Sequence, residues 1–158
     1  MPLPPCGTSS SSIHGAEGRY RPVVLRVPDD VFQQIVGHAY DGLPDEACGL
    51  IAGPPGTGDA AVFYPCRNVA ESSRVYTIDP KDHLRADRDA EDHGLEVIGV
   101  VHSHTHTDAY PSPTDVAQAP DPGWHYVIVS LRDVAPMLRS YRIVEEEIRE
   151  EPVALVYR

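Results

Sequence analysis

The sequence predicts a single α/β domain, with a mixed β-sheet flanked by helices. Short apolar segments typical of strands alternate with segments whose apolar residues have helical spacing, and this alternation is typical of α/β folds. Three further strand candidates, at 124–131, 137–144 and 153–157, are close enough in the chain to form an antiparallel meander. A chain of 158 residues is long enough for one domain of this kind.

The first half of the chain is expected to supply a strand, a helix and a hairpin. Residues 23–27 are apolar enough for a strand, and Pro28 is followed by Asp29 and Asp30, which favour a helix start. The helix should end at Gly42. Two strands, at 47–52 and 60–65, flank a turn sequence rich in Pro and Gly and are expected to form a hairpin.

The second half begins with a helix from Asp79 to Gly94 whose surface is mostly charged, so we expect it to be exposed to solvent. Residues 97–101 form a continuous apolar run, which predicts a strand covered on both faces. A short helix should begin near Ser112. The acidic residues 145–151 are expected to form a solvated turn and strand edge.

Composition limits the compartment and the partners. Residues 1–20 are rich in Ser, Pro and Gly, so we expect a disordered tail ahead of a domain over 21–158. The chain begins without the basic and apolar segments of a secretory signal, and its three cysteines form no CxxC pair, which favours a cytoplasmic protein with free thiols. A net charge of −11 argues against nucleic acid and anionic membranes as partners and favours a protein or small-molecule substrate.

A pair of histidines follows the apolar run at 97–101. Side chains alternate along a strand, so His102 and His104 should project from one face while Ser103 points to the other. Two imidazoles would then converge on one point. Alone, the pattern is weak, because short His-rich stretches also occur without a metal.

Two interpretations apply to Asp115. Ser112 and Asp115 have the spacing of a helix capping box, which needs no metal. The loop at 105–111 is also long enough to fold the start of this helix back over the histidine pair, where Asp115 would become a third ligand. The two interpretations are partly compatible, since a helix start can direct a carboxylate toward a cation.

Two imidazoles and one carboxylate, with a fourth position left for water, are the ligand set of catalytic zinc. A hydrolase also needs a group that takes a proton from the water and delivers it to the leaving amine. Glu46, between a helix end and an apolar strand, is the best candidate, although spacing alone does not bring it to the metal.

These residues match a known signature. The segment HSHTHTDAYPSPTD at 102–115, with an upstream glutamate in DEACGLIAG at 45–53, resembles the catalytic motif of the JAMM/MPN+ metallopeptidases, and the resemblance extends over about 23–157. It implies a cytidine-deaminase-like α/β fold and one zinc ion per chain. The roles that it implies are zinc ligands for His102, His104 and Asp115, general base for Glu46, and oxyanion stabilisation for Ser112.

Shorter segments narrow the resemblance. DEACGLIAGPPG, YPSPTDV, HYVIVS and RSYRIV are similar to bacterial family members that release cysteine from a ubiquitin-like sulfur-carrier protein. This implies hydrolysis of the amide between the carrier's C-terminal glycine and an added cysteine, in cysteine biosynthesis. The alternatives are an isopeptidase that removes ubiquitin-like modifiers from lysines and a non-catalytic scaffold. A zinc deaminase is excluded, because the sequence lacks His-x-Glu and Pro-Cys-x-x-Cys.

The segment RNVAESSRVYTIDP at 67–80 resembles a family stretch near the substrate tail, with Ser73 where proline is usual. Arg67 or Arg74 is a candidate partner for the carboxylate of the terminal cysteine. His106 is interpreted as a surface residue and Cys48 as a buried structural thiol. The carrier tail is expected to add to a strand edge that the sequence does not identify.

Overall fold

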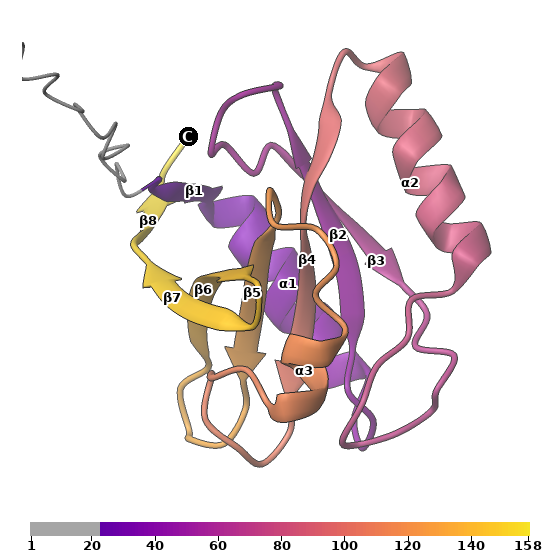
Figure 1. Cartoon of the computed structure of the whole chain (residues 1–158), viewed down its shortest axis with the longest axis vertical. Coiled ribbons are helices and arrows are strands. Elements are labelled where there is room, and N and C mark those ends of the chain that lie inside the picture. Colours follow the sequence, from indigo (N-terminus) through magenta and orange to yellow (C-terminus); the bar gives the residue numbers. More distant parts are fainter. Residues whose placement is uncertain (1–22) are drawn as a thin grey trace, which may run out of the picture.

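The computed structural model describes residues 23–158; the expected tail at 1–20, its boundary and Cys6 lie outside this part of the chain. Six strands form one sheet in the order β3-β2-β4-β5-β6-β7, with helices on both faces (Figure 1). The α/β prediction is therefore confirmed. The elements are β1 (Leu25–Pro28), α1 (Asp29–Asp41), β2 (Cys48–Gly53), β3 (Val62–Cys66), α2 (Pro80–Asp92), β4 (Glu96–His104), α3 (Pro113–Ala117), β5 (His125–Ser130), β6 (Met137–Val144), β7 (Glu147–Glu151) and β8 (Val153–Val156).

The sheet is mixed, as expected. β4 and β5 are parallel, while the other neighbours in the sheet, including the β2–β3 hairpin, are antiparallel. The prediction was wrong for the last strand, because β8 does not continue the meander but pairs in parallel with β1 as a separate two-stranded sheet. Pro152 explains the change: it has no N–H for the ladder, and its carbonyl instead accepts a hydrogen bond from the Leu25 amide at 3.0 Å.

Each face of the sheet is covered by its own apolar core. On one face α1 buries Val31, Ile35 and Ala39. On the other face lies α2, which was expected to be solvent-exposed but buries Ala86 and Ala90. Alanine side chains are small enough for a helix with an otherwise charged surface to lie close to the sheet. None of the helices in residues 23–158 is long and apolar enough to cross a membrane.

Strand β4 lies between β2 and β5 and is buried on both sides over residues 98–104, as its apolar run predicted. The hydrophobic side chains of this strand give way to His102, Ser103 and His104 at its carboxyl end. Ser103 faces α1's side of the sheet, where its Oγ accepts a hydrogen bond from the Ala47 amide at 2.8 Å. The two histidines therefore face the side that carries α2 and α3.

The acidic segment at 145–151 is more structured than expected. Glu145 and Glu146 form the turn, with positive φ angles of 51° and 66°, and β7 forms the edge of the sheet. Glu151 is not solvated but fully buried. Its carboxylate contacts His125, accepts a hydrogen bond from Ser140 at 2.7 Å and pairs with Arg142 at 3.0 Å. A buried carboxylate needs such partners, because its desolvation is otherwise too costly.

Replacing Glu151 by Ala is expected to lower the free energy of unfolding by about 3–5 kcal/mol, because it removes the carboxylate partner of the buried His125 and of the partly buried Arg142. Burial raises the pKa of Glu151, but the hydrogen bonds from His125 and Ser140 outweigh it and lower the pKa below its usual 4.5. The stabilisation is thus present above that pH and lost as the pH falls.

Urea titrations at neutral and acidic pH measure this effect. Glu147→Ala is the matched control on the same strand: its exposed side chain pairs with Arg149 at 3.0 Å, and its loss should cost less than about 1 kcal/mol. Equal destabilisation by both substitutions would contradict the assignment.

Candidate active site

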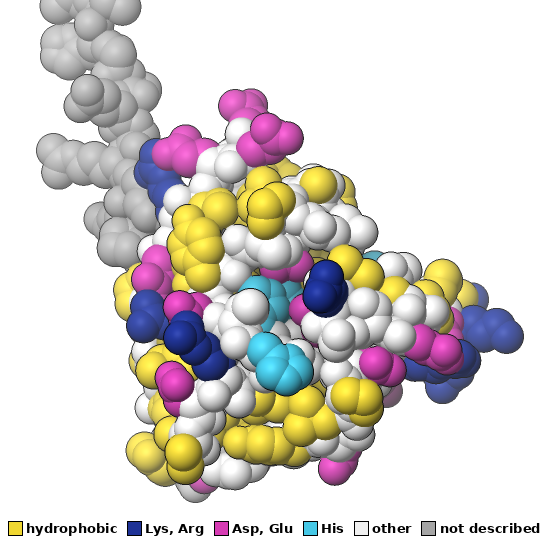
Figure 2. All heavy atoms as spheres, turned by 90° about the horizontal axis from the view of Figure 1, so that it is seen from below, with side chains coloured by type: hydrophobic (Ala, Val, Ile, Leu, Met, Phe, Trp, Pro, Cys, Tyr) yellow, Lys and Arg dark blue, Asp and Glu magenta, His cyan; other side chains and the backbone are white. Residues whose placement is uncertain are grey.

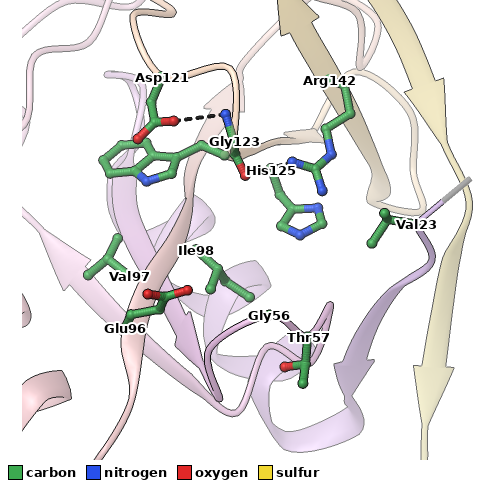
Figure 3. A pocket seen from close by; sticks show the side chains of 11 residues that line it. Val23, Gly56, Thr57, Glu96, Val97, Ile98, Asp121, Gly123, His125 and Arg142 are labelled. Atoms are coloured by element: carbon green, nitrogen blue, oxygen red, sulfur yellow. Dashed lines mark hydrogen bonds between the residues drawn. The ribbon is translucent and has the colours of Figure 1, made fainter. Parts of the chain in front are cut away.

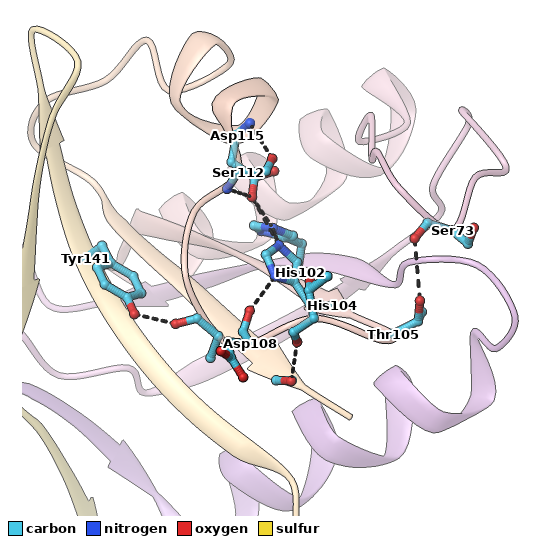
Figure 4. A network of polar contacts seen from close by, with 11 residues as sticks. Ser73, His102, His104, Thr105, Asp108, Ser112, Asp115 and Tyr141 are labelled. Atoms are coloured by element: carbon cyan, nitrogen blue, oxygen red, sulfur yellow. Dashed lines mark hydrogen bonds and ion pairs between the residues drawn. The ribbon is translucent and has the colours of Figure 1, made fainter. Parts of the chain in front are cut away.

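Three side chains from β4 and α3 converge at the carboxyl end of β4. His102 Nε2 lies 3.1 Å from His104 Nε2, and both lie near Asp115 Oδ2, at 3.2 and 3.1 Å (Figure 4). All three side chains are buried. Within residues 23–158 they are the one group of three His, Cys, Asp or Glu residues arranged to hold a metal ion.

The start of α3 forms the capping box and also brings Asp115 to the two histidines. Ser112 Oγ accepts a hydrogen bond from the Asp115 amide at 3.1 Å, and Asp115 Oδ2 accepts one from the Ser112 amide at 2.8 Å, which completes a capping box. The same Oδ2 faces the two imidazoles. Burial raises the pKa of Asp115, but contacts with both histidines and the Ser112 amide hold it well below its usual range. The carboxylate therefore stays ionised.

Neighbouring groups fix the orientation of each imidazole. His104 Nδ1 lies 2.7 Å from the carbonyl oxygen of Asp108, so Nδ1 carries the hydrogen and Nε2 presents its lone pair. Tyr76 stacks on His102 with ring centroids 4.3 Å apart and planes 20° apart. The sequence motif did not identify Tyr76 or Asp108; the one available signal was the tyrosine in the family stretch at 67–80.

The donor set fits a divalent metal ion. Two imidazole nitrogens and a carboxylate oxygen lie at mutual distances of 3.1–3.2 Å, an arrangement that a shared cation would stabilise. Ligands at 2.0–2.1 Å from a tetrahedral zinc ion are about 3.3–3.4 Å apart, close to these separations. The three residues thus form a nearly complete ligand set.

Glu46 is brought to this group by the tertiary structure. Its amide donates to the Ser72 carbonyl at 2.8 Å, and its own carbonyl accepts from Asn68 Nδ2 at 3.0 Å. The side chain is buried, and Oε2 has no hydrogen-bond partner among the described residues. Burial raises the pKa of Glu46 to about 7, with His104 opposing and Asp115 adding to the rise. Asn68, which lies in the family stretch at 67–80 but was given no role in the sequence analysis, holds the backbone of Glu46 together with Ser72.

A cavity of about 580 Å³ opens beside the histidines. Glu46, His104 and Ser112 line it, so the structure places three of the five expected site residues on its wall. Figure 2 looks onto this end of the molecule from below and shows histidine side chains near its centre, with basic side chains close by. The remaining lining residues are Ser73, Arg74, Thr105, His106 and Thr107.

Of the other residues singled out in the sequence, some border the cavity and others do not. Arg67 pairs with Glu71 at 3.2 Å and does not line the cavity. His106 is on the surface, as expected, although it borders the cavity. Cys48 is a free, buried thiol, also as expected. Burial, with added repulsion from Cys66, raises the pKa of Cys48 to about 12, so it is no nucleophile.

A second cavity, of about 380 Å³, lies at the opposite end of β4 (Figure 3). His125 and Arg142 project toward it, but both are committed to Glu151, and Arg142 also donates to the Gly123 carbonyl at 2.6 Å. The groups suited to hydrolytic chemistry are therefore concentrated at the His102 end of the strand.

Comparison with known proteins identifies the family. A family model described as prokaryotic homologs of the JAB domain matches residues 28–144, most of the described structure. The chain belongs to this family, the JAMM peptidases indicated by the motif at 102–115. This confirms the resemblance found in the sequence.

The chain is 43% identical to the CysO-cysteine peptidase of Mycobacterium tuberculosis over 134 residues, which cover 84% of this chain and 92% of that protein. It is 34% identical to the desampylase of Haloferax volcanii over 136 residues, covering 83% and 96% of the two chains. A solution structure of a Desulfitobacterium hafniense protein matches with a TM-score of 0.78 and 32% identity, covering 84% and 93%. The chain therefore shares its fold with this D. hafniense protein.

The chain is expected to bind one divalent metal ion, measured by elemental analysis after dialysis and by the rise in melting temperature on adding metal. Asp115→Ala should reduce the metal content by at least tenfold, because it removes one ligand of three. Asp108→Ala is the control: its side chain pairs with Arg132 at 2.7 Å, and only its backbone carbonyl meets His104. Equal metal content in all three proteins would contradict the site.

In metal-free protein, Glu46→Gln should increase stability above pH 7. Burial raises the pKa of Glu46 from 4.5 to about 7, so ionisation of this carboxyl group destabilises the folded protein. The penalty is absent below pH 4.5, grows as the pH rises and is complete above 7, where it reaches on the order of 3 kcal/mol. Denaturant titrations of both proteins in chelator at pH 5 and 8 measure it. A difference that does not vary with pH would contradict the shift.

Proposed function

We propose that this protein is a zinc-dependent peptidase that removes a cysteine added to the C-terminal glycine of a ubiquitin-like sulfur carrier. The observation that carries the proposal is the convergence of His102, His104 and Asp115 beside Glu46, whose buried Oε2 lacks a partner. A buried carboxylate oxygen without a hydrogen-bond partner lowers the stability of the fold, so it does not serve the structure. It is suited to a substrate or water proton.

Each residue has a distinct role in this proposal. His102, His104 and Asp115 would hold the zinc ion, which when bound supplies Lewis acidity for activating water and polarising the scissile carbonyl. Glu46 takes a proton from the attacking water at its carboxylate and delivers it to the leaving amide nitrogen. Its pKa of about 7 suits both steps near neutral pH.

Ser112 would stabilise the developing oxyanion. Its Oγ accepts a hydrogen bond from the Asp115 amide, so the hydroxyl hydrogen is free to donate into the cavity. The capping box holds the Ser112 backbone and so fixes the position of the hydroxyl before substrate binds. Removing one donor of this type usually costs 10²–10³ in kcat, about 3–4 kcal/mol.

The substrate follows from the relatives. Identity of 43% over nearly the whole of the CysO-cysteine peptidase favours the same amide, between a carrier's C-terminal residue and cysteine. The free cysteine released would be the product of cysteine biosynthesis. The thiols of Cys48 and Cys66 are unpaired, which agrees with the cytoplasm as the expected compartment.

An isopeptidase acting on protein conjugates is the second candidate. The 34% identity to the desampylase favours it, and the same metal group and Glu46 would serve both reactions. The leaving group distinguishes them: a terminal cysteine in one case, the side chain of a lysine in the other. A non-catalytic scaffold is disfavoured, since it has no need of a metal group beside an unpaired carboxylate.

Mass spectrometry of a sulfur carrier with a C-terminal cysteine adduct, incubated with zinc-loaded protein, tests the proposal. We expect loss of one cysteine from the carrier with wild type, none with Glu46→Ala, and a rate about 10²–10³ lower with Ser112→Ala. A carrier linked through its C-terminus to a lysine side chain is incubated in the same way as the second substrate. Cleavage of the lysine conjugate alone would support the isopeptidase instead, and cleavage of neither would support the scaffold.

A further inference from the structure

The cavity beside the metal ligands contains a basic residue that has no partner of its own. Arg74 lines this cavity with Glu46 and His104, and its side chain is exposed. Within residues 23–158 its guanidinium makes no hydrogen bond or ion pair, whereas Arg67 in the same loop pairs with Glu71 and Arg132 pairs with Asp108. The guanidinium of Arg74 is therefore available to a ligand.

The loop that carries Arg74 is fixed relative to Glu46. Asn68 is the centre of this arrangement: its Nδ2 donates to the carbonyls of Glu46 and Val75, both at 3.0 Å, and its Oδ1 accepts from the amides of Ala70 and Thr77, at 3.0 and 2.9 Å. These bonds close the loop on itself and attach it to the backbone of Glu46.

Two further contacts hold the loop next to Arg74. The Ser72 carbonyl accepts from the Glu46 amide, and the Arg74 amide donates to Ser72 Oγ at 3.1 Å. Across the cavity, Thr105 Oγ1 donates to the Ser73 carbonyl at 3.4 Å (Figure 4). These bonds hold the backbone of Arg74 close to Glu46, the group that would protonate the leaving amine.

Charge favours an anionic ligand at this position. The chain has a net charge of −11, so its overall field repels carboxylates, and an anionic ligand needs a positive side chain inside the cavity. Arg74 is the only Lys or Arg among the residues that line the cavity, and its planar guanidinium can bind a carboxylate through two parallel hydrogen bonds.

A leaving C-terminal residue carries a carboxylate close to the scissile bond. Its carboxyl carbon is two bonds from the amide nitrogen, about 2.5 Å away. An amide nitrogen that receives a proton from Glu46 therefore places the carboxylate within the same cavity. A lysine conjugate has no such anion, because the backbone of the lysine is several bonds away and is itself amidated.

We infer that Arg74 binds the α-carboxylate of the leaving residue, so that the enzyme acts as a carboxypeptidase that removes one terminal residue from the carrier tail. The inference rests on the proposed function. It assigns Arg74 as the residue that distinguishes a terminal adduct from an isopeptide.

The test compares two carriers, one ending in cysteine with a free carboxylate and one ending in cysteine amide, by mass spectrometry of the zinc-loaded protein. Wild type should cleave the acid about 10–100-fold more efficiently than the amide, the usual effect of one hydrogen-bonded charge. Arg74→Ala should lose this preference by slowing the acid alone. Arg74→Lys should restore part of it, since lysine keeps the charge but lacks the paired donors.

Arg85→Ala, which removes an exposed arginine paired with Asp82, is the control for net charge and should keep the full preference. Wild type that cleaves acid and amide equally fast would overturn the inference while leaving the proposed function intact. So would equal slowing of both substrates by Arg74→Ala, or loss of the preference in Arg67→Ala. If wild type releases cysteine from neither carrier, the proposed function itself fails.

Discussion

Strand β4 is buried on both faces over residues 98–104, so every polar side chain in this stretch must find its partner inside the protein. His102 and His104 meet this requirement by facing Asp115, and Ser103 meets it through the Ala47 amide. The position of α3 follows, because Asp115 can reach the histidines only when its helix begins beside the end of the strand. The chain closes its core and builds its candidate metal centre with the same contacts.

The two buried glutamates show how partners determine the use of a carboxylate. Glu151 receives hydrogen bonds at both oxygens, from Ser140 and Arg142 among others, and its pKa is lowered despite burial. Glu46 keeps one oxygen without a partner, and burial raises its pKa to about 7. The first holds the edge strand β7 in place. The second remains able to exchange a proton, as a general base must.

The loop between β3 and α2 links the backbone of Glu46 to the wall of the cavity beside the histidines. Asn68 uses both ends of its side-chain amide to attach this loop to the backbone of Glu46. This attachment comes from side-chain to backbone bonds in a loop without regular structure, and it does not depend on a proline at the position of Ser73.

The sequence by itself determined the elements and the metal-ligand pattern. Period-two alternation placed His102 and His104 on one face, and capping chemistry placed Asp115 at a helix start, because both are local properties of the chain. The family motif added Glu46 and Ser112.

Only the tertiary structure decided which distant groups meet. The partners of Glu46, the stacking of Tyr76 on His102, the burial of Glu151 and the pairing of β8 with β1 all join segments far apart in the chain. Local sequence patterns do not reveal such contacts, because a glutamate that becomes buried and one that stays exposed are the same residue in the sequence. Packing of the sheet against its helices determines which carboxylates lose water, and with it which of them can take part in catalysis.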